Sequence, residues 1–283
     1  MTVTAPPLLG AWLCAVLLTA GCASPGTPPQ AVFPDLATRL DALLPADALL
    51  LGEQHDAPQH QRIHRDVIDA LAQRGVLAAV VVEMAEQDTT TRTLPSFAPE
   101  YLVRNTLQWN DRQWPWAQYG AAIMVAVRHG IPVLGSNLPS DRMRSAMQAA
   151  DADTLLDGAA FQAQQAQIRS GHCNMLPESQ IVPMTRIQIA RDVAMAQTIT
   201  DALQPGKSVV LLAGAGHVDR QLGVPRHIAP GITVKSLQLR AQTPMDAPDL
   251  PTHFDQVWPT APVNAKDYCA AFQPPNPRPQ ASP

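Results

Sequence analysis

The sequence predicts an α/β fold: a mostly parallel central sheet flanked by helices, with a smaller helical subdomain inserted into it. Short, almost continuously apolar runs alternate with longer stretches whose apolar residues recur at helical spacing. This alternation is typical of βαβ units, in which helices cover both faces of parallel strands. The chain has 283 residues, of which 46% are hydrophobic and 16% charged, so it can bury one sizeable core.

Four apolar runs are the predicted core strands, and two amphipathic stretches are the predicted crossover helices. The spacing of Ile63, Val67, Ile68 and Leu71 predicts the first of these helices. The predicted core strands lie at residues 48–51, 79–82, 131–134 and 208–212, a further strand at 233–239, and the helices at 59–74 and 116–129.

The stretch at residues 140–203 interrupts the alternation. It is rich in Ala, Gln and Met, contains no strand candidate and has a break at 171–177, which predicts the inserted helical subdomain. The 28 prolines are concentrated at the two ends of the chain, where they indicate extended tails. We therefore expect an α/β domain at residues 35–243 and a Pro-rich C-terminal extension at residues 244–283.

The N-terminal residues 1–22 have the features of a lipoprotein signal peptide. An apolar run at residues 8–20 leads to Cys22 through Leu-Thr-Ala-Gly, which resembles a lipobox. A lipid on Cys22 would anchor the chain in a membrane, with residues 23–34 as a Pro-rich tether. Because Ala23 rather than Asp follows the cysteine, we expect a periplasm-facing lipoprotein of the outer membrane. The alternative is an ordinary signal peptide with an incidental cysteine, and residues 1–7 lack the usual Lys or Arg.

Export would also decide the state of the cysteines, because it places them in an oxidising compartment. Cys14 would leave with the signal peptide and Cys22 would carry the lipid, so Cys173 and Cys269 remain. These two have no CxxC spacing, which favours a disulfide over a metal site. A pair of buried free thiols is the alternative.

The overall charge argues against one class of partner. The formal net charge is −4 and the pI is about 6.0, so the chain has no basic excess to neutralise a phosphate backbone. Nucleic acid is therefore not an expected partner.

Polar residues directly follow each of the four core strands. Ligands of open α/β sheets bind at the carboxyl ends of the strands, so we expect Glu53, His55, Glu83 and His217 to meet in one crevice. Such a set could hold a divalent metal or act as acid and base groups. Alternatively, the glutamates cap helices and the histidines are loop residues. His60 lies four residues from His64 on one helix face and could reach His55, or it belongs to a solvated face.

A set of short motifs between residues 49 and 239 resembles the ChaN-like haem-binding lipoproteins. The motifs occur in the family's order, and the ordered set is more specific than any one of them. They are residues 51–56 with His60, 83–84, 109–110, 114–115 with Tyr119, 137–139, 172–173, Gln188 with 191–192, 214–217 and 223–225.

The resemblance implies an outer-membrane lipoprotein that binds haem and takes part in iron uptake. It further implies that two chains form a homodimer that holds haem through a tyrosinate, with help from a histidine. Tyr119 lies inside a matching motif and is the first candidate ligand, because an anionic oxygen prefers ferric iron. His55, His60 and His217 are the candidate histidines. The alternative for Tyr119 is a core or rim aromatic.

The same motifs also resemble a wider superfamily that includes Tiki-type metalloproteases and erythromycin esterases. In that case Glu53, His55, Glu83 and His217 would orient a water or a divalent metal in a hydrolase. The lipobox and the tryptophan-rich residues 109–119 favour the haem carrier, because haem needs a large aromatic-lined surface. The polar cluster favours the hydrolase. The sequence thus predicts a haem-binding protein more than an enzyme.

Overall fold

The computed structural model describes residues 1–2, 33, 35–242, 253–264 and 266–272. Cys22 and almost all of the expected signal peptide and tether lie outside the described residues, as do residues 244–252, 265 and 273–283 of the expected C-terminal extension. The fold lies within residues 31–283, which form one unit. Within the described residues, no helix has both the length and the hydropathy needed to cross a bilayer.

A six-stranded sheet forms the centre of the fold, with the strand order β3-β2-β4-β1-β5-β6. Every neighbouring pair in this sheet is parallel, which confirms the predicted α/β class. The strands are β1 Ala48–Glu53, β2 Leu77–Glu86, β3 Val133–Asn137, β4 Ser208–Gly214, β5 Val234–Ala241 and β6 Gln256–Thr260.

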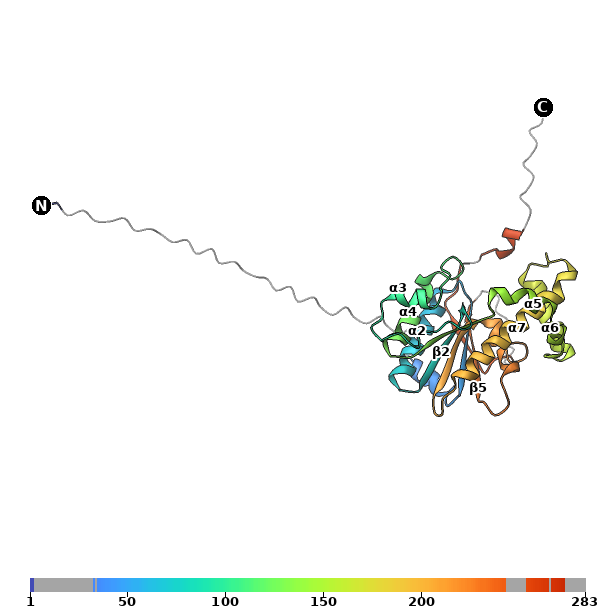
Figure 1. Ribbon diagram of the computed structural model, residues 1–283, viewed down its shortest axis with the longest axis horizontal. Helices are drawn as coiled ribbons and strands as arrows, with labels where there is room; N and C mark the ends of the chain where they lie inside the picture. Colours follow the sequence, from blue (N-terminus) through green and yellow to red (C-terminus); the bar gives the residue numbers. More distant parts are fainter. Residues whose placement is uncertain (3–32, 34, 243–252, 265, 273–283) are drawn as a thin grey trace, which may run out of the picture. The chain divides into compact units, whose positions relative to one another are not determined.

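Helices cover both faces of the sheet, as the continuously apolar strands require. On one face, Leu49 and Leu51 pack with residues of α2 (Pro58–Gln73) and α4 (Trp116–Arg128). On the other face, Leu50 packs with residues of α7 (Glu178–Ala202). Figure 1 shows α2, α3 (Glu100–Thr106) and α4 on one side of the sheet and α7 on the other. A short helix, α1 (Leu36–Asp41), precedes β1.

Between β3 and β4 the named elements of the described structure are all helices. After η1 (Ser140–Arg142) come α5 (Met143–Gln148), η2 (Ala150–Thr154) and α6 (Gly158–Gly171), and then α7. Ile187 of α7 packs against Leu138 and Ala146, so this long helix belongs both to the helical insertion and to the sheet. It therefore connects the insertion to the carboxyl end of the sheet.

The strand β6 is the main difference from the predicted elements, because the sequence analysis expected only an extension there. It pairs with β5 at the edge of the sheet, and Trp258 is buried against Phe33. Pro259 is exposed on this strand. Proline is tolerated on an edge strand because its missing N–H has no ladder bond to make, and this proline hid the strand in the sequence.

The disulfide predicted between Cys173 and Cys269 is present, with the two Cα atoms 5.6 Å apart. Cys173 lies two residues beyond the end of α6, and Cys269 lies in η5 (Tyr268–Phe272). The bond therefore attaches the chain beyond β6 to the helical insertion.

Candidate functional site

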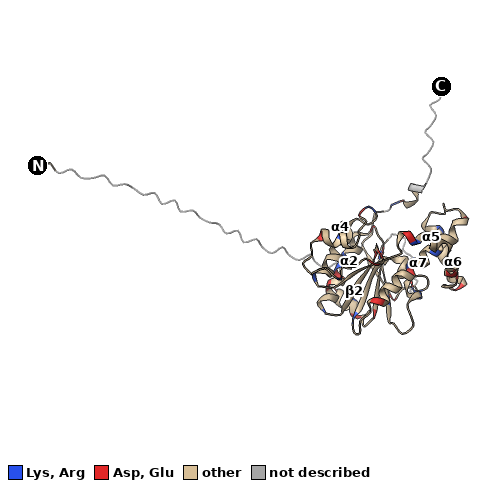
Figure 2. Cartoon of the chain, viewed as in Figure 1, with Lys and Arg blue, Asp and Glu red and all other residues tan. Residues whose placement is uncertain are grey.

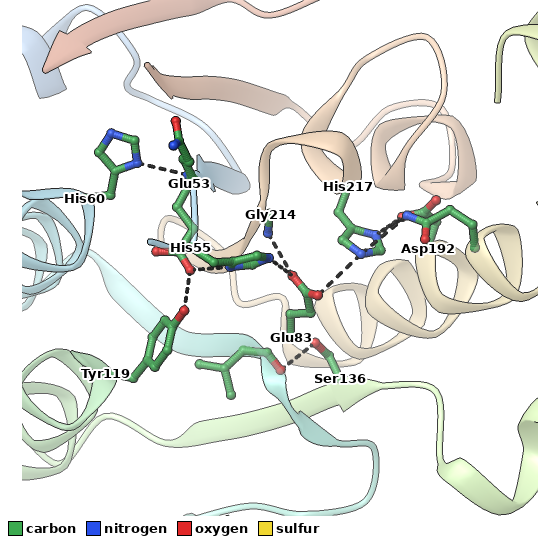
Figure 3. A network of polar contacts seen from close by, with 12 residues as sticks. Glu53, His55, His60, Glu83, Tyr119, Ser136, Asp192, Gly214 and His217 are labelled. Carbon is green, nitrogen blue, oxygen red and sulfur yellow. Dashed lines mark hydrogen bonds and ion pairs between the residues drawn. The ribbon is translucent and has the colours of Figure 1, made fainter. Parts of the chain in front are cut away.

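The strand order brings three strand ends together at the carboxyl edge of the sheet. β4 lies between β2 and β1, so Glu83 of β2, Glu53 of β1 and the η3 turn (Ala215–Val218) after β4 are neighbours. The predicted residues Glu53, His55, Glu83 and His217 meet there, in a connected polar cluster shown in Figure 3.

Glu53 is the centre of one half of the cluster and is only 2% exposed. Its Oε1 atom accepts hydrogen bonds from His55 Nδ1 and from the Tyr119 hydroxyl, each at 2.8 Å. Its Oε2 atom accepts one from Gln61 Nε2 at 2.7 Å. Burial alone would raise the pKa of Glu53, but the hydrogen bond from His55 and the nearby imidazoles hold that pKa below its usual value. Glu53 is therefore a carboxylate rather than a helix cap.

His55 is the most accessible member of the cluster, with 42% of its side chain exposed, against 8% for His217 and 7% for Glu83. Its Nδ1 atom faces Glu53, and its Nε2 atom lies 4.0 Å from Glu83 Oε2. The ring contacts Trp114 edge-on, with centroids 4.9 Å apart. Burial lowers the pKa of His55, but Glu53 and Glu83 outweigh it, and the net shift is upward. A Cβ atom at Gly214 would lie 2.9 Å from Nε2, so only glycine fits beside this ring.

The other half of the cluster is a buried chain of Glu83, His217 and Asp192. His217 Nδ1 lies 2.6 Å from Asp192 Oδ1, and its Nε2 lies 3.5 Å from Glu83 Oε1. Glu83 Oε2 also accepts the Gly214 backbone N–H at 2.8 Å. Burial opposes every charge here, yet the two carboxylates raise the pKa of His217 to about 10 and the imidazolium lowers the pKa of Glu83 to about 2. His217 is therefore a locked cation at neutral pH and has no free base to offer.

Asp192 and Gln188 are site residues that the sequence analysis did not assign. Both lie on α7, and Gln188 Nε2 is 3.2 Å from His217 Nδ1. Burial raises the pKa of Asp192 to about 6, even though His217 acts in the opposite direction. Both residues belong to a motif seen in the sequence. The rule that sites form at the carboxyl ends of strands does not predict that a helix of an insertion packs against the sheet there.

Tyr119 lies in the core of the site and is 2% exposed. Its hydroxyl donates to Glu53, and burial together with that carboxylate raises the pKa of the phenol far above its usual value. Its ring packs against Trp109 and Trp114, with centroids 6.0 Å away in each case. In this arrangement Tyr119 keeps its proton and is covered, which does not suit the anionic ligand that the resemblance implies.

His60 and His64 are both fully buried, so the alternative of a solvated helix face is wrong for them. His60 Nδ1 accepts the Gln54 backbone N–H at 2.9 Å, and Nε2 lies 2.8 Å from Thr260 Oγ1 on β6. Neither ring nitrogen of His60 is left for an iron atom. His64 Nδ1 lies 3.7 Å from Glu53 Oε2 and makes no hydrogen bond in the described structure.

The expected divalent metal site needs correction. Within the described residues, no group of three or more His, Cys, Asp or Glu side chains is arranged to hold a metal ion. The reason lies in the pairing: Glu53 and Glu83 are already engaged by hydrogen-bond donors, and Glu83 and Asp192 hold His217 as a cation.

A pocket of about 400 Å³ adjoins the cluster at the ends of β2 and β3. Its apolar side chains include Met84, Trp114, Leu138 and Met143. Trp114 also contacts His55, so the pocket and the exposed imidazole share one wall. The remaining lining residues are mostly polar: Gln108, Asn110, Gln113, Asn137, Ser140 and Glu86, with Ala85.

An open parallel sheet with a polar cluster and an adjoining pocket of mixed polar and apolar lining at its carboxyl edge is typical of α/β proteins that bind or transform a ligand. The sequence model of the family described as "Haem-binding uptake, Tiki superfamily, ChaN" matches residues 39–228. The chain therefore belongs to this family, which confirms the resemblance seen in its motifs.

A solved structure shows the same fold, and two others have a weaker similarity. ChaN of Campylobacter jejuni, described with cofacial haem binding, has a TM-score of 0.64 at 22% identity, over 78% of this chain and 90% of that chain. A mutant of the erythromycin esterase EreC has a TM-score of 0.45 at 14% identity, over 78% of each chain. A Bacillus cereus protein has a TM-score of 0.41 at 13% identity, over 73% of this chain and 69% of that one. No curated protein is similar enough in sequence to match.

Proposed function

We propose that this chain binds haem at the carboxyl edge of its sheet and takes part in haem or iron acquisition. Membership of the haem-binding uptake family supports the class of ligand. The observation that carries the proposal in this chain is His55, an accessible imidazole that is held by a carboxylate and contacts Trp114, a residue that lines the adjoining pocket.

The residues present fit haem in two ways. Trp114, Met84, Leu138 and Met143 offer apolar surface of the kind a porphyrin ring needs. His55 offers a ring nitrogen for iron, and Glu53 holds its other nitrogen, the arrangement that orients metal-binding histidines. Bound haem would supply a ferric iron that could take a ligand from the protein. We assign that role to His55 and not to Tyr119, whose hydroxyl is committed to Glu53.

Ferric haem titrated into the purified chain tests the proposal. We expect saturable binding, seen as a shifted Soret band, that is lost or greatly weakened in His55→Ala. His129→Ala is the matched control, because His129 is an exposed histidine paired with Asp69 away from the cluster. Absence of any saturable Soret change with the unmodified chain would refute haem binding.

We also propose that the chain is anchored in the outer membrane and that two copies share haem. A lipid on Cys22, following the lipobox, would hold the domain on the periplasmic side of the outer membrane. Sharing of haem between two copies of the chain follows from the resemblance. Membrane fractionation of Cys22→Ser tests the anchor, and sedimentation with and without haem tests the dimer. A Cys22→Ser chain that stays in the membrane fraction, or a monomeric haem complex, would contradict these parts.

A hydrolase is the second candidate, in a form without a divalent metal. The pair of Glu53 and His55 is a carboxylate-oriented imidazole, which is how many enzymes position a general base. The fixed positive charge of His217 could stabilise a developing oxyanion. Turnover of p-nitrophenyl acetate by the chain in the presence of EDTA, abolished in His55→Ala, would support it. Equal turnover by that variant would exclude it.

A further inference from the structure

Arg191 on α7 stands apart from the other half-buried arginines of the described chain. Its Nε atom is buried and has no hydrogen-bond partner, and its guanidinium makes no ion pair within the described structure. The others each have a partner: Arg39 with Asp35, Arg65 with Asp66, Arg104 with Asp111, Arg169 with Glu178, Arg186 with Asp153 and Arg240 with Gln238.

The register of α7 places Arg191 on the same side of the helix as two residues that contact the polar cluster and the pocket lining. Three residues earlier, Gln188 contacts His217. Four residues earlier, Ile187 packs with Leu138 and Met143, which line the pocket. Residues three and four apart lie on the same side of a helix, so Arg191 lies between these two contacts.

The nearest carboxylate in the sequence does not accept a hydrogen bond from Arg191. Asp192 is the next residue, and its Oδ1 atom is taken by His217. Its Oδ2 atom is buried without a hydrogen-bond partner, so it does not bond to Arg191. A buried guanidinium atom without an acceptor is costly, and such groups in native structures call for a partner or a function.

We propose that Arg191 binds a carboxylate group of the ligand, which for haem is a propionate. The inference rests on the proposed function. Haem combines an apolar ring with two carboxylates, and the chain offers apolar side chains in the pocket lining and an arginine that makes no hydrogen bond or ion pair with a described carboxylate. The planar guanidinium suits a carboxylate because it can donate two parallel hydrogen bonds.

A comparison of ferric haem with its dimethyl ester tests the proposal, since the ester has the same ring and iron but no carboxylate. For the unmodified chain, Soret titrations should show binding at least about tenfold tighter for haem than for the ester, as expected for a charge-assisted pair. In Arg191→Ala this preference should disappear, because haem binding falls to the level of the ester and ester binding stays unchanged. Arg191→Lys should keep part of the preference.

The controls separate ligand recognition from a structural role. Arg144→Ala removes an exposed arginine of α5 and should leave the preference intact. The thermal midpoint of the ligand-free Arg191→Ala chain should not fall, because the side chain makes no bond that its removal would break. A lower midpoint, or an equal loss of haem and ester binding, would overturn the assignment. Equal binding of haem and ester by the unmodified chain would refute the role of Arg191 but not haem binding. Absence of binding of either compound would refute both.

Discussion

At the scale of single residues, Glu53 decides how its neighbours are protonated. It accepts hydrogen bonds from an imidazole, a phenol and an amide while it is almost completely buried. His55 must therefore keep its proton on Nδ1, which leaves Nε2 as the nitrogen for a ligand. The same carboxylate keeps Tyr119 protonated. One buried charge thus favours His55 over Tyr119 as the proposed ligand for iron.

Removal of the negative charge of Glu53 should weaken the binding of haem by His55 without changing the shape of the site. Glu53→Gln keeps the size of the side chain but loses the negative charge that supports His55. We expect haem affinity to fall about 10- to 100-fold, as for other carboxylates that support metal-binding histidines. A Soret titration measures the change, with the exposed Glu100→Gln as control. Unchanged affinity in Glu53→Gln would show that His55 does not depend on Glu53.

The tyrosine and the histidine can be told apart directly. Tyr119→Phe removes a hydrogen bond to a buried carboxylate, so we expect a loss of about 2 kcal/mol in the free energy of unfolding. Haem affinity and the Soret maximum should stay close to those of the unmodified chain, whereas His55→Ala should change both. The opposite pattern would make Tyr119 the ligand and would require its hydroxyl to leave Glu53 when haem binds.

At the scale of elements, α2 is held to the sheet edge by a buried histidine. His60 bridges the chain before α2 and Thr260 of β6, and burial lowers its pKa from 6.5 to about 4. The unfolded chain therefore takes up a proton at His60 at a higher pH than the folded chain does. The stability that His60 contributes is fully present above pH 6.5 and is lost as the pH falls toward 4.

We expect this loss to be on the order of 2 kcal/mol, after allowance for residual solvation. Urea unfolding of the unmodified chain and of His60→Gln, measured from pH 7 to pH 4, tests the expectation. The variant should be less stable near neutral pH and should lose less stability on acidification. His129→Gln, at an exposed position, should follow the unmodified chain. If the free energy of unfolding of all three chains changed with pH in the same way, protonation of His60 would not be a cause of the loss.

The elements also show where sequence reasoning succeeds. β1 and β4 are buried along their whole length, so their apolar runs identified them, and the polar residues after them identified the site. Asp192 was not assigned because its place depends on the packing of α7, which no local pattern encodes. β6 was missed because a single edge strand with an exposed proline looks like a tail, and only its pairing with β5 reveals it.

At the scale of the whole molecule, the disulfide closes a large loop. Cys173 and Cys269 are 96 residues apart in sequence, and the chain-entropy model gives about 4.7 kcal/mol for such a loop as an upper value. We expect the double variant Cys173→Ser with Cys269→Ser to unfold at a lower urea concentration than the unmodified chain. Mass spectrometry after alkylation should show no free thiol at either position in the unmodified chain. Equal midpoints for the two chains would mean that the bond does not stabilise the fold.

Charge is spread rather than concentrated on the described elements, as Figure 2 shows for Lys, Arg, Asp and Glu. The described acids that matter for the site are buried in it: Glu53, Glu83 and Asp192 are each 5% exposed or less. Recognition of a ligand therefore depends on short-range contacts at the carboxyl edge, where salt screens less than at the surface.

The place of β1 in the sheet has a consequence for how the chain folds during synthesis. β1 is the first strand to be made, yet it pairs with β4 and β5, so that Leu50 lies opposite Leu211 and Ser236. Contacts this distant in sequence slow folding, because a long loop must close before they form. The nascent chain therefore cannot pair both edges of β1 until β5, which ends at Ala241, has left the ribosome. Until then the backbone N–H and C=O groups along one edge of β1 have no strand to bind.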